Sequence, residues 1–109
     1  MDFAYVVRIS FEADRAKAFD AFVDWLLAKH VTDVCDAGGC HGEVLLVDSG
    51  LVVEARYRFA SREAFEVYER DHAPRLRVEA LELLAANGCA PNAGVVFARS
   101  SGRLVGVRS

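Results

Sequence analysis

Two histidines, His30 and His72, and the nearby carboxylate of Asp33 are the residues best suited to acid–base chemistry. An unperturbed histidine has a pKa near neutral pH, so it can donate or accept a proton under physiological conditions. Asp33 follows His30 closely enough to orient the imidazole ring. A structural interpretation is also open for each histidine. In the last turn of a helix, a histidine complements the free carbonyl groups and the helix dipole, which raises its pKa.

Four charged residues with the same strand parity form a second candidate site. Arg8 lies in one alternating segment, and Glu54, Arg56 and Arg58 lie in another. Alternate residues of a strand point to the same face of a sheet, so these side chains can converge. Arginines in this arrangement can anchor a carboxylate or an enolate. Alternatively, Glu54 neutralises the arginines in an ion-pair network across a dimer interface.

Other residues that could take part in binding or catalysis have simpler structural interpretations. Trp25, Tyr57 and Tyr68 are expected to be core or interface rings rather than a cage around a substrate. Arg75 and Arg77 flank one leucine on different faces of a helix, so at most one of them can point to a given site. The chain carries no Gly-x-Gly-x-x-Gly, Walker, nucleophile-elbow or His-Glu-x-x-His motif, and no cofactor is expected from its motifs.

Hydrophobic periodicity predicts the elements of the first half of the chain. Apolar residues alternate from Phe3 to Phe11 and from Leu51 to Ala60, a period typical of half-buried strands. Over residues 13–30 the apolar positions recur every three or four residues, which predicts an amphipathic helix. Its apolar stripe consists of Phe19, Phe22, Val23, Leu26, Leu27 and His30. The glycine pair within residues 31–42 predicts a connection from this helix to a strand over residues 43–48.

The second half of the chain predicts two consecutive helices and a final strand. Ser61 has the side chain of a helix N-cap, and Pro74 suits the first turn of a new helix that begins near His72. Asn87 and Gly88 are a typical helix C-terminus. The remaining predictions are a strand over Gly94–Arg99, a break at residues 100–102, and a frayed tail or brief strand over residues 103–109.

The order of these elements is strand, helix, strand, strand, helix pair, strand. This is the βαββαβ order of ferredoxin-like α+β folds, in which helices cover one face of an antiparallel sheet. The 109 residues predict one domain spanning residues 1–109. Because the open sheet face mixes charged and apolar residues, and the last helix is apolar on two sides, we expect two sheets to pair face to face. The predicted assembly is a homodimer, a dimeric α+β barrel.

Charge and hydropathy exclude several classes of partner. With 13 basic and 16 acidic residues the net charge is −3, and no basic patch of the kind that binds nucleic acid is present. No apolar run approaches the ~20 residues of a membrane span, so membrane binding is not expected either. The N-terminal segment lacks the basic flank and cleavage site of a signal peptide, which predicts a cytoplasmic location.

The three cysteines do not form the even set of a secreted disulfide framework. Cys35 and Cys40 have acidic residues and His41 nearby, so a metal site can be drawn there. That site lacks a second ligand pair at a familiar zinc spacing. The simpler interpretation is two reduced thiols in the connection between the first helix and the next strand, and we expect no metal.

Several runs of the chain together resemble a known type of protein. They are Lys29-His-Val-Thr-Asp-Val34, Gly39-Cys40, Glu54-Ala-Arg-Tyr57, and His72-Ala-Pro-Arg-Leu-Arg77 followed by Leu81. The pattern resembles an uncharacterised bacterial family of short single-domain proteins that is similar to the dimeric α+β barrel superfamily. Thr32 stands where that family usually has proline, and His41 where an aromatic residue is expected.

The resemblance implies a ferredoxin-like fold, a homodimer and a small acidic or enolisable ligand in the barrel cavity. The superfamily includes cofactor-independent monooxygenases, isomerases and dehalogenases, so His72, His30 and Asp33 are the acid–base candidates. Arg8, Glu54, Arg56 and Arg58 are the ligand-binding candidates. Fold analogy does not decide whether the chain is an enzyme. A non-catalytic dimeric interaction or regulatory protein with a filled barrel is the alternative, and haem binding is a third.

Overall fold

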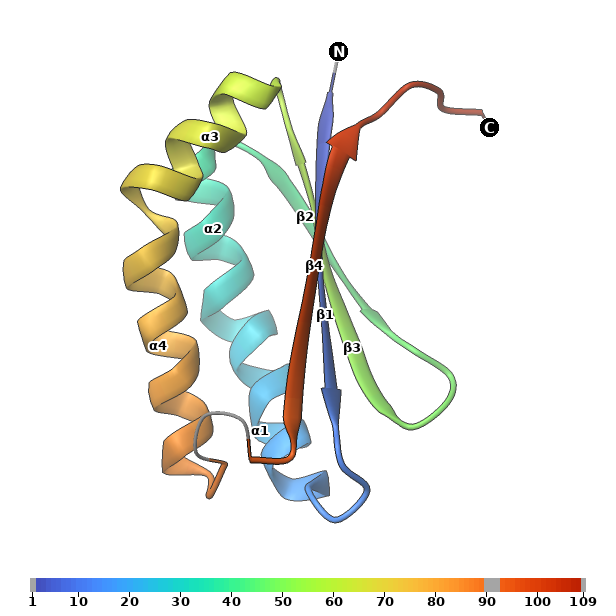
Figure 1. The fold of residues 1–109 in the computed structure, drawn as a ribbon, viewed down its shortest axis with the longest axis vertical. Helices are drawn as coiled ribbons and strands as arrows, with labels where there is room; N and C mark the ends of the chain where they lie inside the picture. Colours follow the sequence, from blue (N-terminus) through green and yellow to red (C-terminus); the bar gives the residue numbers. More distant parts are fainter. Residues whose placement is uncertain (1, 90–92, 109) are drawn as a thin grey trace.

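A four-stranded antiparallel sheet forms one layer of the protein (Figure 1). The computed structural model describes residues 2–89 and 93–108. The strands are β1 (Phe3–Phe11), β2 (His41–Leu46), β3 (Leu51–Phe59) and β4 (Val95–Arg103). They lie in the order β2-β3-β1-β4, with β1 in the centre paired to both β3 and β4. The predicted ferredoxin-like α+β fold is therefore confirmed.

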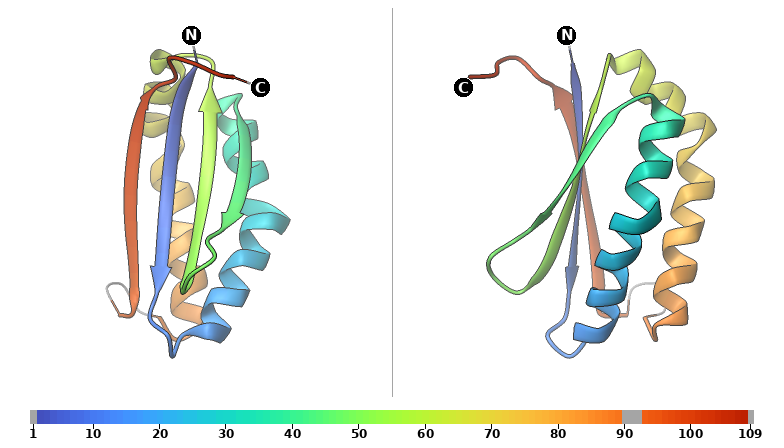
Figure 2. Two further views of the ribbon diagram at one scale, coloured as in Figure 1. Left: turned by 90° about the vertical axis from the view of Figure 1, so that its right-hand side faces the viewer. Right: turned by 180° about the vertical axis from the view of Figure 1, so that it is seen from behind.

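The helices form a second layer on one face of the sheet and leave the other face bare (Figure 2). They are α1 (Ala16–Trp25), the π-helical turn η1 (Leu26–His30), α2 (Val31–Gly38), α3 (Arg62–Asp71) and α4 (Ala73–Ala86). None of the helices in the described ranges is both long and apolar enough to cross a membrane.

The core lies between these two layers. One alternating apolar row of each central strand faces the helices and is buried, as the predicted half-buried strands require. On β1 the buried residues are Phe3, Tyr5, Ile9 and Phe11, and on β3 they are Val53, Ala55, Tyr57 and Phe59. The opposite parity, which includes Arg8 and Arg56, points to the bare face because every second side chain of a strand does so.

The first helical segment is longer than its sequence pattern predicts. It does not end at His30 but passes through η1 into α2 and ends at Gly38, where Gly39 takes the left-handed conformation with φ 62°. In η1 the main-chain N–H of Val31 bonds to the carbonyl of Leu26, five residues back. A π-turn holds one more residue than an α-turn and rotates the following side chains around the axis. Leu27, which lies within this turn, is 63% exposed, and its predicted place on the buried stripe is wrong.

The junctions of α3 and α4 agree with the sequence. The Ser61 hydroxyl accepts a hydrogen bond from the main-chain N–H of Ala64 at 3.1 Å, as an N-cap does. His72 separates α3 from α4, and Pro74 lies in the first turn of α4, where its missing N–H leaves no broken bond. Gly88, with φ 82°, follows the end of α4.

The last strand is also longer than predicted. Residues 100–102 are not a break, because β4 continues to Arg103 with Ser101 opposite Tyr5 and Gly102 opposite Ala4. Serine and glycine have low strand propensity, but main-chain pairing with the long central strand outweighs it. Residues 104–108 have neither helix nor strand structure and extend away from the sheet (Figure 1).

Candidate functional site

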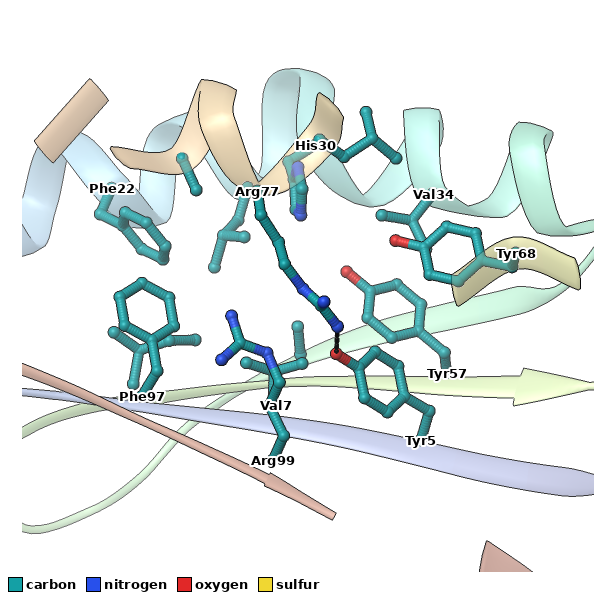
Figure 3. A pocket seen from close by; sticks show the side chains of 15 residues that line it. Tyr5, Val7, Phe22, His30, Val34, Tyr57, Tyr68, Arg77, Phe97 and Arg99 are labelled. Carbon is teal, nitrogen blue, oxygen red and sulfur yellow. Dashed lines mark hydrogen bonds between the residues drawn. The ribbon is translucent and has the colours of Figure 1, made fainter. Parts of the chain in front are cut away.

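A small pocket lies between the sheet and the helices (Figure 3). Strands β1, β3 and β4 provide one wall and the helical segments provide the other. Most of its lining is apolar, and its volume is about 40 Å³. At about 10–15 Å³ for each water-sized position, it has room for about three non-hydrogen atoms. Six polar or charged side chains line it: Tyr5, His30, Tyr57, Tyr68, Arg77 and Arg99.

Two polar atoms in this pocket are buried without a partner among the described residues. They are Nδ1 of His30 in the helix layer and the hydroxyl of Tyr57 on β3. Leaving a buried donor or acceptor unpaired costs about 1–3 kcal/mol, so most proteins avoid it. Because the two atoms come from opposite walls of one cavity, a polar group held between them can satisfy both.

The protonation states of these groups follow from their burial. Burial lowers the pKa of His30 to about 4, although the carboxylates of Asp33 and Glu79 act in the opposite direction. The imidazole is therefore neutral at pH 7 and stacks on Trp25 with ring centroids 4.4 Å apart. Burial likewise raises the pKa of the Tyr57 hydroxyl, which stays protonated. The pocket thus offers a neutral nitrogen and a hydroxyl donor.

This result corrects the structural interpretation of His30. A raised pKa was expected because His30 was placed in the last turn of a helix. In the structure the helix continues through α2, so the carbonyl groups near His30 are used within the helix. Loss of hydration then dominates, and the pKa falls.

Two arginines bring positive charge to the pocket from different layers. Arg77 extends from α4 and Arg99 from β4, and both guanidinium groups point into the cavity (Figure 3). Arg77 donates hydrogen bonds to the Tyr5 hydroxyl at 3.3 Å and to Glu69 at 2.6 Å. Arg99 lies over the ring of Phe97, 5.2 Å from its centroid. None of the described residues that line the pocket is acidic. Glu69 compensates the charge of Arg77, whereas Arg99 forms no ion pair with a described residue, so its charge favours an anion.

The three acid–base candidates are not brought together. His30 lines the pocket, but Asp33 bonds to Lys29, whose amino group also donates to Glu79 at 2.8 Å. The hydrogen bond predicted between Asp33 and His30 is not formed at Nδ1, for which none of the described residues is a partner. His72 lies at the α3–α4 joint, with Nδ1 2.8 Å from Nη2 of Arg75.

The predicted anion-binding residues lie on the bare face of the sheet. Glu54 is only 8% exposed and accepts hydrogen bonds at 2.9 Å from both Arg8 and Arg56. Arg58 is instead 3.7 Å from Asp2. A shallow hollow of about 360 Å³ on this face is lined by Arg56, Arg58 and His41, among others. Three of the four candidate residues, Arg8, Glu54 and Arg56, are therefore hydrogen-bonded to one another within a single chain.

The pocket includes residues that sequence reasoning gave other roles. Tyr57 and Tyr68 were interpreted as core rings, which they are, but their hydroxyls also reach the cavity (Figure 3). Arg99 was not singled out. Its parity on β4, shared with the buried Val95 and the partly buried Phe97, places a charge on the row that faces the helices. That conflict between charge and position was the available signal.

Metal ligation receives no support from the geometry. Within residues 2–89 and 93–108, no group of three or more histidine, cysteine or acidic side chains is arranged to hold a metal ion. Cys35 and Cys40 are adjacent at the end of α2, but no third histidine, cysteine or acidic side chain of the described residues joins them in an arrangement that could hold a metal ion.

The fold is shared with solved structures of low sequence identity. No protein-family model matches the chain, and no curated protein matches it in sequence. The chain is similar to Rv0793 from Mycobacterium tuberculosis, with TM-score 0.65, 16% identity and full coverage of both chains. It is also similar to the ActVA-Orf6 monooxygenase of Streptomyces coelicolor in complex with Nanaomycin D, with TM-score 0.62 and 16% identity over 98% of this chain and 92% of that one.

A third similar structure is a dimeric ferredoxin-like protein from an uncultured marine organism, with TM-score 0.62 and 13% identity over 99% of this chain and 93% of that one. At such identities the similarity shows the fold alone. The resemblance to an uncharacterised bacterial family therefore stays a prediction. What the comparisons establish is that this chain has the ferredoxin-like α+β fold of these proteins.

Proposed function

We propose that this protein binds a small acidic molecule in the pocket between its sheet and its helices. The observation that carries the proposal is the pair of buried, unpartnered polar atoms, His30 Nδ1 and the Tyr57 hydroxyl, facing one cavity. Arg77 and Arg99 supply the positive charge for an anionic group. The similar Streptomyces monooxygenase, solved with a small ligand, supports a binding role for the fold.

The polar groups define what the ligand must carry. A protonated tyrosine hydroxyl donates to an oxygen, and a neutral imidazole accepts the proton of a hydroxyl group. One hydroxyl or enol between Tyr57 and His30 therefore satisfies both residues. A carboxylate or enolate then faces Arg77 and Arg99, to which charge-assisted hydrogen bonds are short and strong. The volume of about 40 Å³ limits the enclosed part of the ligand to a few atoms.

Acid–base chemistry without a cofactor is the reaction that this pocket supports best. If the bound group is an enol or an activated C–H, the neutral His30 is positioned to accept its proton. The negative charge that develops is then stabilised by the arginines and the tyrosine hydroxyl. His30 is consequently the proposed base of the site, and Arg77 and Arg99 are the proposed anion anchors.

Replacing Arg99 by alanine is expected to weaken binding of a carboxylate ligand about 10–100-fold, because a hydrogen bond to a charged group contributes about 1.5–3 kcal/mol. Arg99 is exposed, so stability should change little. The measurement is a thermal-shift screen of small 2-hydroxy and 2-keto carboxylates, followed by calorimetric titration of the best ligand.

The matched control is Arg103→Ala, which removes an exposed arginine of the same strand that does not line the pocket. Tyr57→Phe provides a second test, since it deletes only the unpaired hydroxyl. We expect it to weaken binding without lowering stability. Ligand binding that is equal in the wild type, Arg99→Ala and Tyr57→Phe would show that the ligand binds elsewhere.

We also infer that two copies of the chain pair through their bare sheet faces. Leu45 and Val96 are exposed on that face, and Val6 lies at its centre between Arg56 and Ser100. The charges of Arg8, Glu54 and Arg56 are already paired, so they can enter an interface without being left uncompensated. Similar solved structures are described as dimeric, which supports this pairing.

The wild-type chain is therefore expected to scatter light as a particle of twice 11.9 kDa at micromolar concentration. Val6→Glu should give a monomer, because it places an additional carboxylate at the centre of the interface, where the neighbouring Arg56 is already bonded to Glu54. Leu27→Glu is the control, since Leu27 is exposed on the helix layer at the other side of the molecule. A monomeric wild type, or a Leu27→Glu variant that dissociates like Val6→Glu, would contradict pairing through the sheet.

A non-catalytic role is also compatible with this dimer. The Arg8–Glu54–Arg56 network fills the part of the face where a ligand of the barrel was expected. An interaction or regulatory protein with a filled barrel is therefore the second candidate function. It predicts a dimer in which none of the carboxylates of the screen raises the melting temperature.

A further inference from the structure

Two cysteines meet where helix α2 ends. Gly39, with φ 62° and ψ 36°, turns the chain into the left-handed conformation after Gly38. The main-chain N–H of Cys40 then bonds back to the carbonyl of Cys35 at 3.1 Å. This is the Schellman arrangement, in which the residue two places beyond the helix approaches the residue that begins its last turn.

The side chains at these two positions normally contact each other, and in most proteins both are apolar. Here both are thiols, and each affects the protonation of the other. The main-chain hydrogen bond from Cys40 to Cys35 brings the two residues close together. Cys35 and Cys40 are thus adjacent in space, as the partners of a disulfide must be.

The two thiols differ in their access to solvent. Cys35 is partly exposed and can be reached by a small reagent, whereas Cys40 is 8% exposed and its Sγ lies 3.8 Å from the carbonyl of Val34. Cys89, the third free cysteine, is 1% exposed and belongs to the other half of the core. One accessible and one adjacent buried thiol form an attacking and resolving pair.

We propose that Cys35 and Cys40 are a dithiol site that a low-molecular-weight disulfide, such as glutathione disulfide, oxidises to an intramolecular disulfide. The Cys35 thiolate attacks one sulfur of the reagent and releases the first glutathione as a thiol. The Cys40 thiolate then attacks Cys35 in the mixed disulfide and releases the second. Two protein thiols are oxidised, one small disulfide is reduced to two thiols, and the two protein protons pass to the released thiols.

The environment of the pair sets the rate of this reaction. Burial raises the pKa of Cys35, and it raises the pKa of Cys40 to about 12. Since only the thiolate attacks, exchange should be slow at neutral pH and accelerate as the pH rises. The disulfide is consequently a response to lasting oxidising conditions. It does not depend on the ligand site proposed above.

The Cys35–Cys40 disulfide would form next to Tyr57, which lines the pocket between the sheet and the helices. A Cβ placed on Gly42 would lie 2.9 Å from the Cys35 sulfur and 3.1 Å from the Tyr57 ring, so these two side chains pack around the same glycine. Linking Cys35 to Cys40 ties the end of α2 to the start of β2 beside Tyr57. Since the link constrains the unfolded chain, we expect the melting temperature to rise by a few degrees.

The test incubates the folded full-length protein with glutathione disulfide at pH 7 and pH 8.5. The number of free thiols should fall from three to one. The intact mass should decrease by two hydrogen atoms, and peptide mapping should place the link between Cys35 and Cys40. The reaction should be at least tenfold faster at the higher pH, as expected from the thiolate fraction. Cys89→Ser should react as the wild type does.

Cys40→Ser should instead accumulate a glutathione adduct on Cys35, because the resolving thiol is missing. The wild-type measurement does not depend on how well any variant folds. Two products would overturn the proposal: a stable glutathione adduct on the wild type, or a disulfide that includes Cys89. It would also be overturned if the folded protein keeps three free thiols under conditions in which the urea-unfolded chain forms the Cys35–Cys40 bond.

Discussion

Replacing Phe22 by alanine is expected to lower the free energy of unfolding by about 3–5 kcal/mol, the usual cost of removing a buried aromatic side chain. Phe22 is 1% exposed, and its ring centroid lies 5.5 Å from that of Trp25 and 5.7 Å from that of Phe11. It also forms one end of the pocket, where the neighbouring side chains cannot close fully over the space. Urea denaturation followed by tryptophan fluorescence measures the change.

Leu27→Ala is the matched comparison, because sequence periodicity places Phe22 and Leu27 on the same apolar stripe. In the structure Leu27 lies within the π-turn and is 63% exposed, so its truncation should cost less than about 1 kcal/mol. A large loss of stability for Leu27→Ala, comparable to that of Phe22→Ala, would mean that the helix is regular and that the π-turn at Leu26–His30 is not formed.

The stability of the protein should fall as the pH is lowered from about 6.5 to about 4, and His30 should account for up to about 3 kcal/mol of the loss. The pKa of His30 is about 4 in the folded chain and near 6.5 when the chain is unfolded. In this window the unfolded state binds more protons, so acid favours unfolding. The stabilising contribution is complete above pH 6.5 and is lost as the pH falls toward 4.

The measurement compares unfolding of the wild type and His30→Leu at several pH values. Leucine cannot titrate and fills the space against Trp25, so the variant should lose less stability between pH 6.5 and 4 than the wild type does. Subtracting the two curves removes the carboxylates that titrate in both proteins. His41→Gln is the control, because it removes an exposed imidazole and keeps His30. Parallel curves for the wild type and His30→Leu would contradict a buried, neutral His30.

The strands and the α3–α4 joint could be predicted because their signals are local. Alternation from Phe3 to Phe11 fixes which side chains face the helices, since a slip of one residue would expose the entire row. The Ser61 cap and the His72–Pro74 joint depend on main-chain groups within a few residues. Such interactions are encoded in consecutive residues, so the sequence specifies them without knowledge of the rest of the fold.

The full lengths of the first helical segment and of β4 could not be predicted in this way. The π-turn adds no distinctive residue type, yet Leu27 within it is exposed and the helix continues beyond it to Gly38. Residues 100–102 form a strand because the central strand β1 offers them main-chain partners. Both outcomes depend on packing and pairing with distant segments, which override local propensity.

The candidate site shows the same division between sequence and structure. The sequence by itself determined the fold class, the face of each central strand and the presence of titratable His30 near the end of a helical stripe. Only the tertiary structure decided that His30 shares a cavity with Tyr57, Arg77 and Arg99, while Arg8, Glu54 and Arg56 pair on the opposite face. Strand alternation and helix periodicity are properties of neighbouring residues. A pocket is instead the space left where distant elements meet, and its electrostatics depend on how far each group is removed from water.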